Sequence, residues 1–168
     1  YSAVKKLDFP VAITIGEDCF ANCTALKEIS LPKLRTGISR QFQYCESLEE
    51  LYLPELVTMA GSTKGCTSLK KVNLPKVNYI GTVAFQSLPN LVEINMPELT
   101  SIDGQGAFAR CTSLKSVHFP KVEEISGSYA FEGCTALESV SFPVLNSVNY
   151  NVFEKFTSLK EVKFGAAT

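Results

Sequence analysis

The sequence predicts a repeat solenoid, in which coils of about 22 residues stack on one another through parallel β-strands. Two unrelated residue types carry the same period, with intervals of 21 to 23 residues between successive copies. The prolines of this series are Pro10, Pro32, Pro54, Pro75, Pro97, Pro120 and Pro143. The leucines are Leu26, Leu48, Leu69, Leu91, Leu114, Leu137 and Leu159. Because both series keep one period along the whole chain, the repeat determines the fold.

Each repeat begins with a short strand that has one buried face. Ile29 and Leu31 alternate with the polar residues Glu28 and Ser30, which is the two-residue period of a half-buried strand. Pro32 follows at once, and because proline has no backbone N–H it ends the strand.

The rest of the repeat predicts a second short segment and a turn. Val77 and Ile80 lie three residues apart, which suits a short extended segment. Residues 83–88 then carry apolar side chains at positions i and i+3, which predicts one helical or 3₁₀ turn. The expected fold class is therefore an α/β-type solenoid, with parallel β ladders and short helical turns. Stacking is required because a single coil cannot bury its own apolar side.

The repeat covers residues 1–168 as six full units with a partial unit at each end, which predicts a single solenoid domain. No linker interrupts the array. Terminal coils of solenoids normally carry polar caps, and neither end of this sequence reads as one. We therefore expect the chain to be a fragment of a longer protein, with adjoining repeats, other domains or self-association at its ends.

Composition excludes several classes of protein. The 168 residues are 45% hydrophobic and 20% charged, with 16 basic and 17 acidic side chains and a net charge of −1. A chain of this length and apolar content can bury a core and is not intrinsically disordered. The balanced charge argues against a nucleic-acid partner, which requires a basic face. No apolar run is long enough to insert into a membrane.

The unit resembles a known family. It has the form Leu-x-x-Ile-x-Leu-Pro, followed after a spacer by Ala-Phe-x-x-Cys, and it is similar to the BspA-type, or treponemal, leucine-rich repeat. Leu34, Leu56 and Val77 occupy the slot where other leucine-rich repeats carry Asn or Cys. The resemblance implies a right-handed coil stack on the surface of gut or oral bacteria or parasitic protists. It also implies an extracellular adhesion or protein-binding role without catalysis.

Some units depart from the pattern. Lys64 is assigned to the aromatic position of its coil, and Gly37 replaces the second apolar residue, with Ile38 beside it. The stretch Gly104-Gln105-Gly106 is interpreted as a loop insertion rather than a phosphate-binding loop, because it lacks a third glycine and a following helix. We expect irregular loops or bends at these places.

Five cysteines form a column with the period of the repeat. They are Cys23, Cys45, Cys66, Cys111 and Cys134, and other units carry Leu88 and Phe156 instead. A position that accepts leucine and phenylalanine selects apolar volume, so we expect buried thiols. Stacking still leaves a Cys45–Cys66 disulfide within reach. The spacing does not fit a zinc site.

Catalysis is not expected. His118 is the only histidine, and it points outward between Val117 and Phe119. No nucleophile elbow, P-loop or dinucleotide fingerprint occurs, and no pair of carboxylates stands out from the periodic array. We predict no catalytic residue, no metal site and no cofactor.

The outward positions of the strands give the candidate ligand-binding residues. This column varies in the sequence, whereas its inward neighbours are restricted to apolar types. Its central members are Tyr52, Asn73, Asn95 and His118. Such a column lines the open face with which solenoids recognise ligands, although a solvated polar face without a ligand gives the same pattern. Flanking it, Glu50, Lys71 and Glu93 are expected to form cross-strand pairs.

These observations favour a non-enzymatic adhesion module that presents a polar strand face to a protein of the host or of a neighbouring cell. Two alternatives stay open. One is a carbohydrate-binding accessory module, in which Tyr52 or another exposed aromatic side chain stacks on a sugar. The other is a structural spacer within a larger surface protein.

Overall fold

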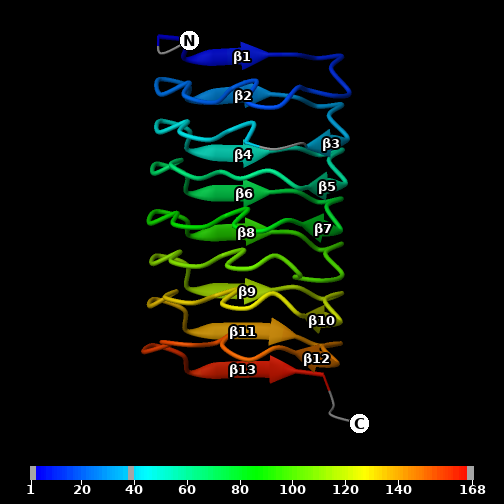
Figure 1. The fold of residues 1–168 in the computed structure, drawn as a ribbon, viewed down its shortest axis with the longest axis vertical. Helices are drawn as coiled ribbons and strands as arrows, with labels where there is room; N and C mark the ends of the chain where they lie inside the picture. Colours follow the sequence, from blue (N-terminus) through cyan, green and yellow to red (C-terminus); the bar gives the residue numbers. More distant parts are fainter. Residues whose placement is uncertain (1–2, 38–39, 166–168) are drawn as a thin grey trace.

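The computed structural model describes residues 3–37 and 40–165, which form a parallel β-solenoid (Figure 1). The longer strands stack in one column, here called the long ladder. They are β1 (Lys6–Asp8), β2 (Glu28–Ser30), β4 (Glu50–Tyr52), β6 (Lys71–Asn73), β8 (Glu93–Asn95), β9 (Ser116–His118), β11 (Ser139–Phe142) and β13 (Glu161–Phe164). The first and last strands, β1 and β13, lie at opposite ends of the stack (Figure 1).

Shorter strands form a second column, the short ladder. They are β3 (Thr36–Gly37), β5 (Thr58–Met59), β7 (Tyr79–Ile80), β10 (Glu124–Ile125) and β12 (Ser147–Val148). Every strand pair in both ladders is parallel and joins neighbouring coils. Single bridges, Thr14 to Thr36 and Ser101 to Glu124, extend the short ladder beyond its strands. The predicted repeat solenoid with parallel ladders is therefore confirmed.

The strand register pairs each residue with the residue at the same repeat position in the neighbouring coil. Leu51 pairs with Val72, and Val72 pairs with Ile94, so the inward side chains of successive strands form one apolar column. The N–H of the residue before the proline donates to the next coil at several repeats, as the Leu74 N–H does to the Asn95 carbonyl at 2.9 Å. The following proline has no N–H to donate, and the long ladder ends there.

Leucine, isoleucine, valine, phenylalanine and cysteine columns form a single core along the stack. In the interior coils these side chains are almost fully buried; Leu51, Leu69 and Ile80, for example, have an exposed fraction of 0%. Burial comes from the coils above and below, since each coil is only one layer thick.

The expected helical turns are wrong: the described residues contain no helix, and thus none that could span a bilayer. The segment at residues 83–88 shows why. Val83 and Ser87 have φ angles of 51° and 57°, and left-handed residues cannot continue a right-handed helix. The N–H groups of Val83, Phe85 and Ser87 donate instead to carbonyls of the next coil at 2.8–3.0 Å.

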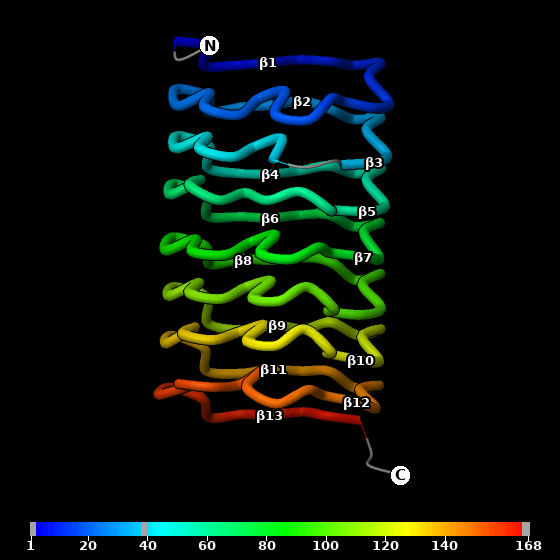
Figure 2. The backbone as a smooth tube through the Cα atoms, viewed as in Figure 1, coloured from blue at the N-terminus to red at the C-terminus, as the bar shows by residue number. Residues whose placement is uncertain are grey.

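The same turn recurs in every coil, as the stacked waves of the chain in Figure 2 show. The residues two before and two after the central aromatic position have positive φ in six of the coils. In the third coil only the later one, Gly65, does, with φ 81°. The turn segments therefore add a hydrogen-bonded layer between coils rather than a layer of helices.

The aromatic side chains of the turns stack along the solenoid. Phe85, Phe108 and Phe131 have ring centroids 5.6 and 5.0 Å apart with nearly parallel planes. Phe20 and Phe42 stack separately at 5.9 Å. The break between these groups lies in the third coil, which has no aromatic residue at this position.

The assignment of Lys64 to that aromatic position is wrong. The structure places Thr63 there, fully buried, with its hydroxyl donating to the Ala84 carbonyl at 2.9 Å. Lys64 is exposed. Counting three residues back from Cys66, as in the other coils, gives Thr63, so the sequence contained the correct register. Threonine is tolerated because the neighbouring coil provides an acceptor for its hydroxyl.

Gly37 occupies the second apolar position as expected, paired with Met59, whereas Ile38 lies outside the described residues. Gln41 takes up part of the space that a larger side chain would fill, since its Oε1 lies 3.9 Å from where a Gly37 Cβ would stand, beside Leu56 Cδ1 at 3.8 Å. Gln41 is buried in the column that holds Ala84 and Ala107 in later coils. The two substitutions therefore compensate each other in volume.

The Gly104-Gln105-Gly106 stretch bends at Gly104 but stays within the hydrogen-bonded stack. Gln105 accepts from the Val83 N–H at 3.0 Å, and the Gly106 N–H donates to Ser128 at 2.9 Å. A Cβ at Gly104 would collide with the backbone carbonyl of Gly81 one coil earlier. Glycine is therefore required at Gly104 by the close approach of two coils.

We predict that Gly104→Ala lowers the free energy of unfolding by about 1–3 kcal/mol, because a methyl group must be inserted between packed backbones. Gly16→Ala is the matched control, since a Cβ there meets nothing within 4 Å. Urea titration followed by circular dichroism measures both. Equal stability of the two variants would contradict the close approach.

Candidate binding face

The four candidate residues lie in one column on the outward side of the long ladder, here called the strand face. Tyr52 pairs in register with Asn73, and Asn73 with Asn95. His118 occupies the same position on β9, which neighbours β8. The structure thus brings together the four residues that the sequence selected, in successive coils.

These side chains project to solvent but interact along the column. Tyr52 is 50% exposed, Asn95 and His118 are exposed, and Asn73 is half-buried. The Asn95 Nδ2 donates to the Asn73 Oδ1 at 2.8 Å, and the His118 Nδ1 lies 3.0 Å from the Ser141 hydroxyl. Each contact uses only part of a side chain, so other polar atoms of the amides and of the imidazole remain without a partner among these contacts.

A charged column flanks the strand face. Lys6 pairs with Glu28 at 2.7 Å, and Lys71 pairs with Glu93 at 3.3 Å, which confirms one of the cross-strand pairs expected around Lys71. Hydrogen bonding to Glu28 raises the pKa of Lys6, and the same bond lowers the pKa of Glu28. The strand face is therefore bordered by charges that largely compensate one another.

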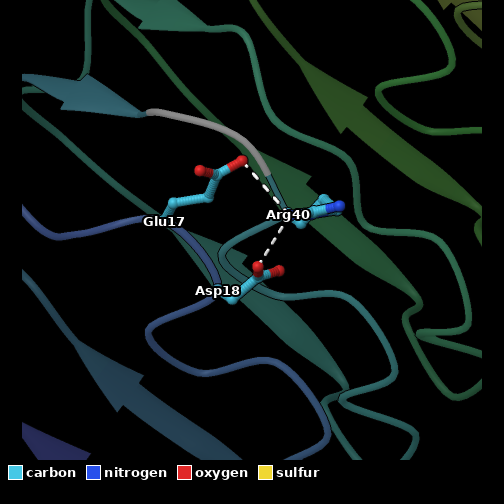
Figure 3. Close-up of polar contacts among 3 residues, drawn as sticks. All are labelled: Glu17, Asp18 and Arg40. Atoms are coloured by element: carbon cyan, nitrogen blue, oxygen red, sulfur yellow. Dashed lines mark hydrogen bonds and ion pairs between the residues drawn. The ribbon is translucent and has the colours of Figure 1, made fainter.

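Further ion pairs connect neighbouring coils elsewhere on the surface. In each, a carboxylate of one coil meets a lysine of the next, as in Glu49 with Lys70 at 2.7 Å and Glu98 with Lys121 at 2.7 Å. Figure 3 shows the corresponding contact in the turns of the first two coils. There one Arg40 nitrogen lies 2.8 Å from Asp18 and 3.3 Å from Glu17. All of these pairs are exposed, so each stabilises the stack only slightly.

A column rich in hydroxyl groups lies on the short ladder. Thr14, Thr36, Thr58 and Tyr79 follow one another in register, and Tyr79 is 40% exposed. Glu124 and Ser147 continue the column further along the stack. This column forms a second polar surface, separate from the strand face.

The expected burial of the cysteine column is confirmed, and all six thiols, including exposed Cys19, are free. The disulfide considered between Cys45 and Cys66 is not formed. The thiols of Cys45, Cys66, Cys111 and Cys134 instead donate to the carbonyl of the preceding coil's aromatic residue, as Cys66 Sγ does to Phe42 at 2.9 Å. Hydrogen bonding with Cys45 and burial both raise the pKa of Cys66 well above its usual value.

This thiol–carbonyl contact is the feature that sequence reasoning missed. The column was interpreted as apolar volume alone, because Leu88 and Phe156 also occupy it. The signal for a donor was the preference for cysteine over other small apolar residues. Across the described part of the chain, no three His, Cys, Asp or Glu side chains cluster in a way that could hold a metal ion.

Comparison with known proteins agrees with the geometry. The family sequence model of the BspA-type leucine-rich repeat region matches residues 1–104 and 80–168 of this chain, with six copies of the repeat. The chain belongs to the BspA-type leucine-rich repeat family. No curated protein matches the chain.

Solved structures share the solenoid. A leucine-rich cell surface protein from Faecalibacterium prausnitzii is 19% identical to this chain, with a TM-score of 0.63. The match covers 96% of this chain and 60% of the Faecalibacterium prausnitzii chain. A leucine-rich repeat protein from Bacteroides ovatus is 24% identical, with a TM-score of 0.61, and the match covers 97% of this chain and 61% of that protein's chain. The T. pallidum leucine-rich repeat protein is 28% identical, with a TM-score of 0.60, and the match covers 79% of this chain and 67% of that protein's chain. The chain thus spans about three fifths of the first two structures.

We predict that acid weakens the stack through its inter-coil ion pairs. Hydrogen bonds to lysine lower the pKa values of several carboxyl groups, so their stabilisation is present above the unfolded pKa and is lost as pH falls through the folded one. They are Glu28, Glu49, Glu55, Glu132 and Glu138.

We therefore expect the melting temperature to decrease as the pH is lowered from about 4.5, where the same carboxyl groups of the unfolded chain are being protonated. Calorimetry between pH 7 and pH 3 measures this decline. The double variant Lys70→Met and Lys160→Met should show a shallower decline, because Glu49 and Glu138 then have no paired lysine. Parallel curves for the variant and the parent chain would contradict a role for these pairs.

Proposed function

We propose that this solenoid is a non-enzymatic binding module of the cell surface that recognises a protein ligand through its strand face. The observation that carries the proposal is the column of Tyr52, Asn73 and Asn95, which stand in register, with His118 at the corresponding position of the neighbouring strand β9. It supplies one aromatic ring, two amides and an imidazole in successive coils of a rigid ladder.

A rigid column of this kind suits protein recognition for energetic reasons. Tyrosine is enriched among residues that dominate binding energy, since its ring adds large contact area and its hydroxyl adds a hydrogen bond. Groups already oriented by Asn–Asn and His–Ser contacts lose little conformational entropy on binding. The neighbouring charges are mostly paired, so specificity would come from the column itself.

Placement at the cell surface and adhesion to a host or neighbouring-cell protein are part of the proposal. They are supported by membership in the BspA-type family and by the Faecalibacterium prausnitzii relative of similar fold, which is described as a cell surface protein. The partner would be an extracellular protein, and no cofactor or metal takes part. The repeat architecture is consistent with a role in binding rather than catalysis.

One observation favours a second candidate, a carbohydrate-binding accessory module. The Tyr52 ring is half-exposed beside the Asn73 amide, and an aromatic ring next to a hydrogen-bonding group can hold a sugar ring. Replacing Tyr52 by phenylalanine keeps this stacking surface, whereas alanine removes it. A glycan array with both variants separates this candidate from a protein-binding role.

We predict that the chain binds at least one immobilised extracellular-matrix protein or mucin with a Kd of tens of micromolar or lower, which is a free energy of about −6 kcal/mol. Changing Tyr52, Asn73, Asn95 and His118 together to alanine should weaken this binding at least about tenfold, since hot-spot side chains dominate such contacts. Surface plasmon resonance across fibronectin, laminin, collagen and mucin measures it.

The matched control changes four exposed residues away from the strand face to alanine: Thr67, Tyr79, Thr112 and Thr135. Binding that survives the strand-face variant, or that the control weakens equally, would overturn the strand face as the binding site. The absence of binding to all four proteins would count against adhesion and leave the structural spacer as the better account.

A further inference from the structure

The short ladder runs along one side of the stack (Figure 1), and its outward surface is here called the side face. Two columns form this face: the outward residues of the short ladder, and the residues immediately before them, which backbone hydrogen bonds join from coil to coil. All of these side chains are exposed or half-buried. From the second coil to the sixth, the first column is Thr36, Thr58, Tyr79, Ser101 and Glu124, and the second is Arg35, Val57, Asn78, Thr100 and Glu123. Each of these coils is covered by a neighbouring coil on both sides.

The charges of the side face are separated along the stack. Arg35 lies in the second coil and Glu123 and Glu124 lie in the sixth, whereas the three coils between them carry no charge in these columns. Among the described residues, none of these three side chains takes part in an ion pair. By contrast, Lys76 and Lys121 in the adjacent column are each paired with a glutamate, at 2.6 and 2.7 Å. The side face therefore offers an unpaired cation and two unpaired anions to a partner.

A hollow lies beside the side face at the third coil. Only residues 60–62 separate the short ladder from the buried turn position there, one residue fewer than in the fourth coil. The hollow has a volume of about 390 Å³, and the ionisable residues that line it are Glu17, Arg40 and Lys64. Arg40 already pairs with Glu17, whereas Lys64 has no ion-pair partner in the described part of the chain. The charge that the hollow leaves free is therefore positive.

The fifth coil projects where the third coil is hollow. Its corresponding segment, residues 103–107, is one residue longer than that of the fourth coil. Gly104 packs against the backbone of Gly81, which aligns these two glycines and makes Asp103 the added residue. Asp103 is exposed, and its carboxylate accepts hydrogen bonds from the Ser101 and Ser126 hydroxyls, each at 2.9 Å. An ordered acidic projection thus lies two coils away from a hollow with a free positive charge.

We propose that the side face binds the side face of a second copy of the chain, in an antiparallel dimer with its two-fold axis at the fourth coil. An axis that lies in the contact plane, along the strand direction, reverses the stack and keeps each column opposite itself. The second coil of one copy then faces the sixth coil of the other, and the third coil faces the fifth. The inference is independent of the strand face, which takes no part in this contact.

Charge and shape select the same register. Arg35 lies two coils before Tyr79 and Glu123 lies two coils after it, each about 10 Å away along the ladder, so Arg35 of each copy meets Glu123 of the other. The hollow and Asp103 lie one coil before and one coil after the same axis, so each hollow receives Asp103 of the second copy. A shift by one coil would set Arg35 against an uncharged residue, and a parallel pair would set Arg35 against Arg35.

Tyr79 lies at the centre of the contact. Its side chain is 40% exposed and would meet Tyr79 of the second copy, with Val57, 38% exposed, one coil away. Tyrosine at the centre of a contact contributes a large share of its binding energy. Two columns over five coils make a small interface, so we expect a reversible dimer with a Kd on the order of 0.1 mM. Association stops at two copies because both use the same face.

Charge reversal tests the register. The first variant carries Arg35→Glu, and the second carries Glu123→Lys together with Glu124→Lys. All three positions are exposed, so both variants should fold as the parent chain does. In either variant alone, like charges meet at both ends of the contact. In an equimolar mixture, opposite charges meet at both ends, because each copy then contributes one native and one reversed group.

Sedimentation velocity between 10 µM and 1 mM at low ionic strength measures association, over a range of about tenfold on either side of the expected Kd. We expect the parent chain to pass from monomer to dimer, each variant alone to dimerise at least about tenfold more weakly, and the mixture to recover the parent's behaviour. Lys115→Glu is the matched control, since it reverses an exposed lysine outside the side face and should leave dimerisation unchanged.

A disulfide tests the axis itself. Tyr79→Cys in a Cys19→Ser background places one exposed thiol per copy at the axis, because the other five thiols are buried. Oxidised glutathione should join two copies through residue 79, forming one S–S bond while the oxidant is reduced to two molecules of glutathione. Thr135→Cys in the same background is the control, since it is exposed away from the side face and should give little linked dimer.

Several results would overturn the proposal. A parent chain that stays monomeric at 1 mM shows that the side faces do not bind each other, and species larger than a dimer exclude a closed two-fold contact. Dimerisation that either charge variant retains, or that Lys115→Glu weakens equally, places the contact elsewhere. A mixture that fails to recover dimerisation, or equal linking through residues 79 and 135, excludes the antiparallel register.

Discussion

The structure depends on one constraint: each coil is a single layer, so every side chain it buries is buried by the coils next to it. The strand ladder fixes the distance between coils, and the other columns must fit that distance. Leucine, phenylalanine and cysteine columns fill it, and at Gly104 two backbones approach so closely that no side chain fits. Thr63 satisfies the same constraint differently, because the Ala84 carbonyl accepts its hydroxyl.

The sequence predicted what this constraint makes periodic. The coil length, the inward strand column and the buried cysteines all follow from spacing, since a stacked position must hold similar residues in every coil. The outward column followed from the same argument, and Tyr52, Asn73 and Asn95 do stand in register. Whether that column binds a ligand depends on a partner's surface, which no pattern within one chain contains.

The conformation of the turns could not be predicted from the spacing of apolar residues. An apolar side chain at every third position suited a helical turn, but the N–H groups of Val83, Phe85 and Ser87 bond across coils and not within the segment. Inter-coil bonding of this kind leaves no local pattern of hydrophobicity. The sequence also does not show that Gln41 compensates for the small volume of Gly37, because these two residues are seen to be neighbours only in the structure.

Deletion of one complete coil tests the stacking constraint most directly. Removing residues 93–115 takes out β8 and its turn and brings Val92 next to Ser116, so that β6 and β9 become neighbours in the same register. Seven turns lie between the eight strands of the long ladder. If stability comes from contacts between neighbouring coils, the shortened chain folds cooperatively with a urea m-value lower by about one seventh. Loss of cooperative folding, or an unchanged m-value, would contradict the account.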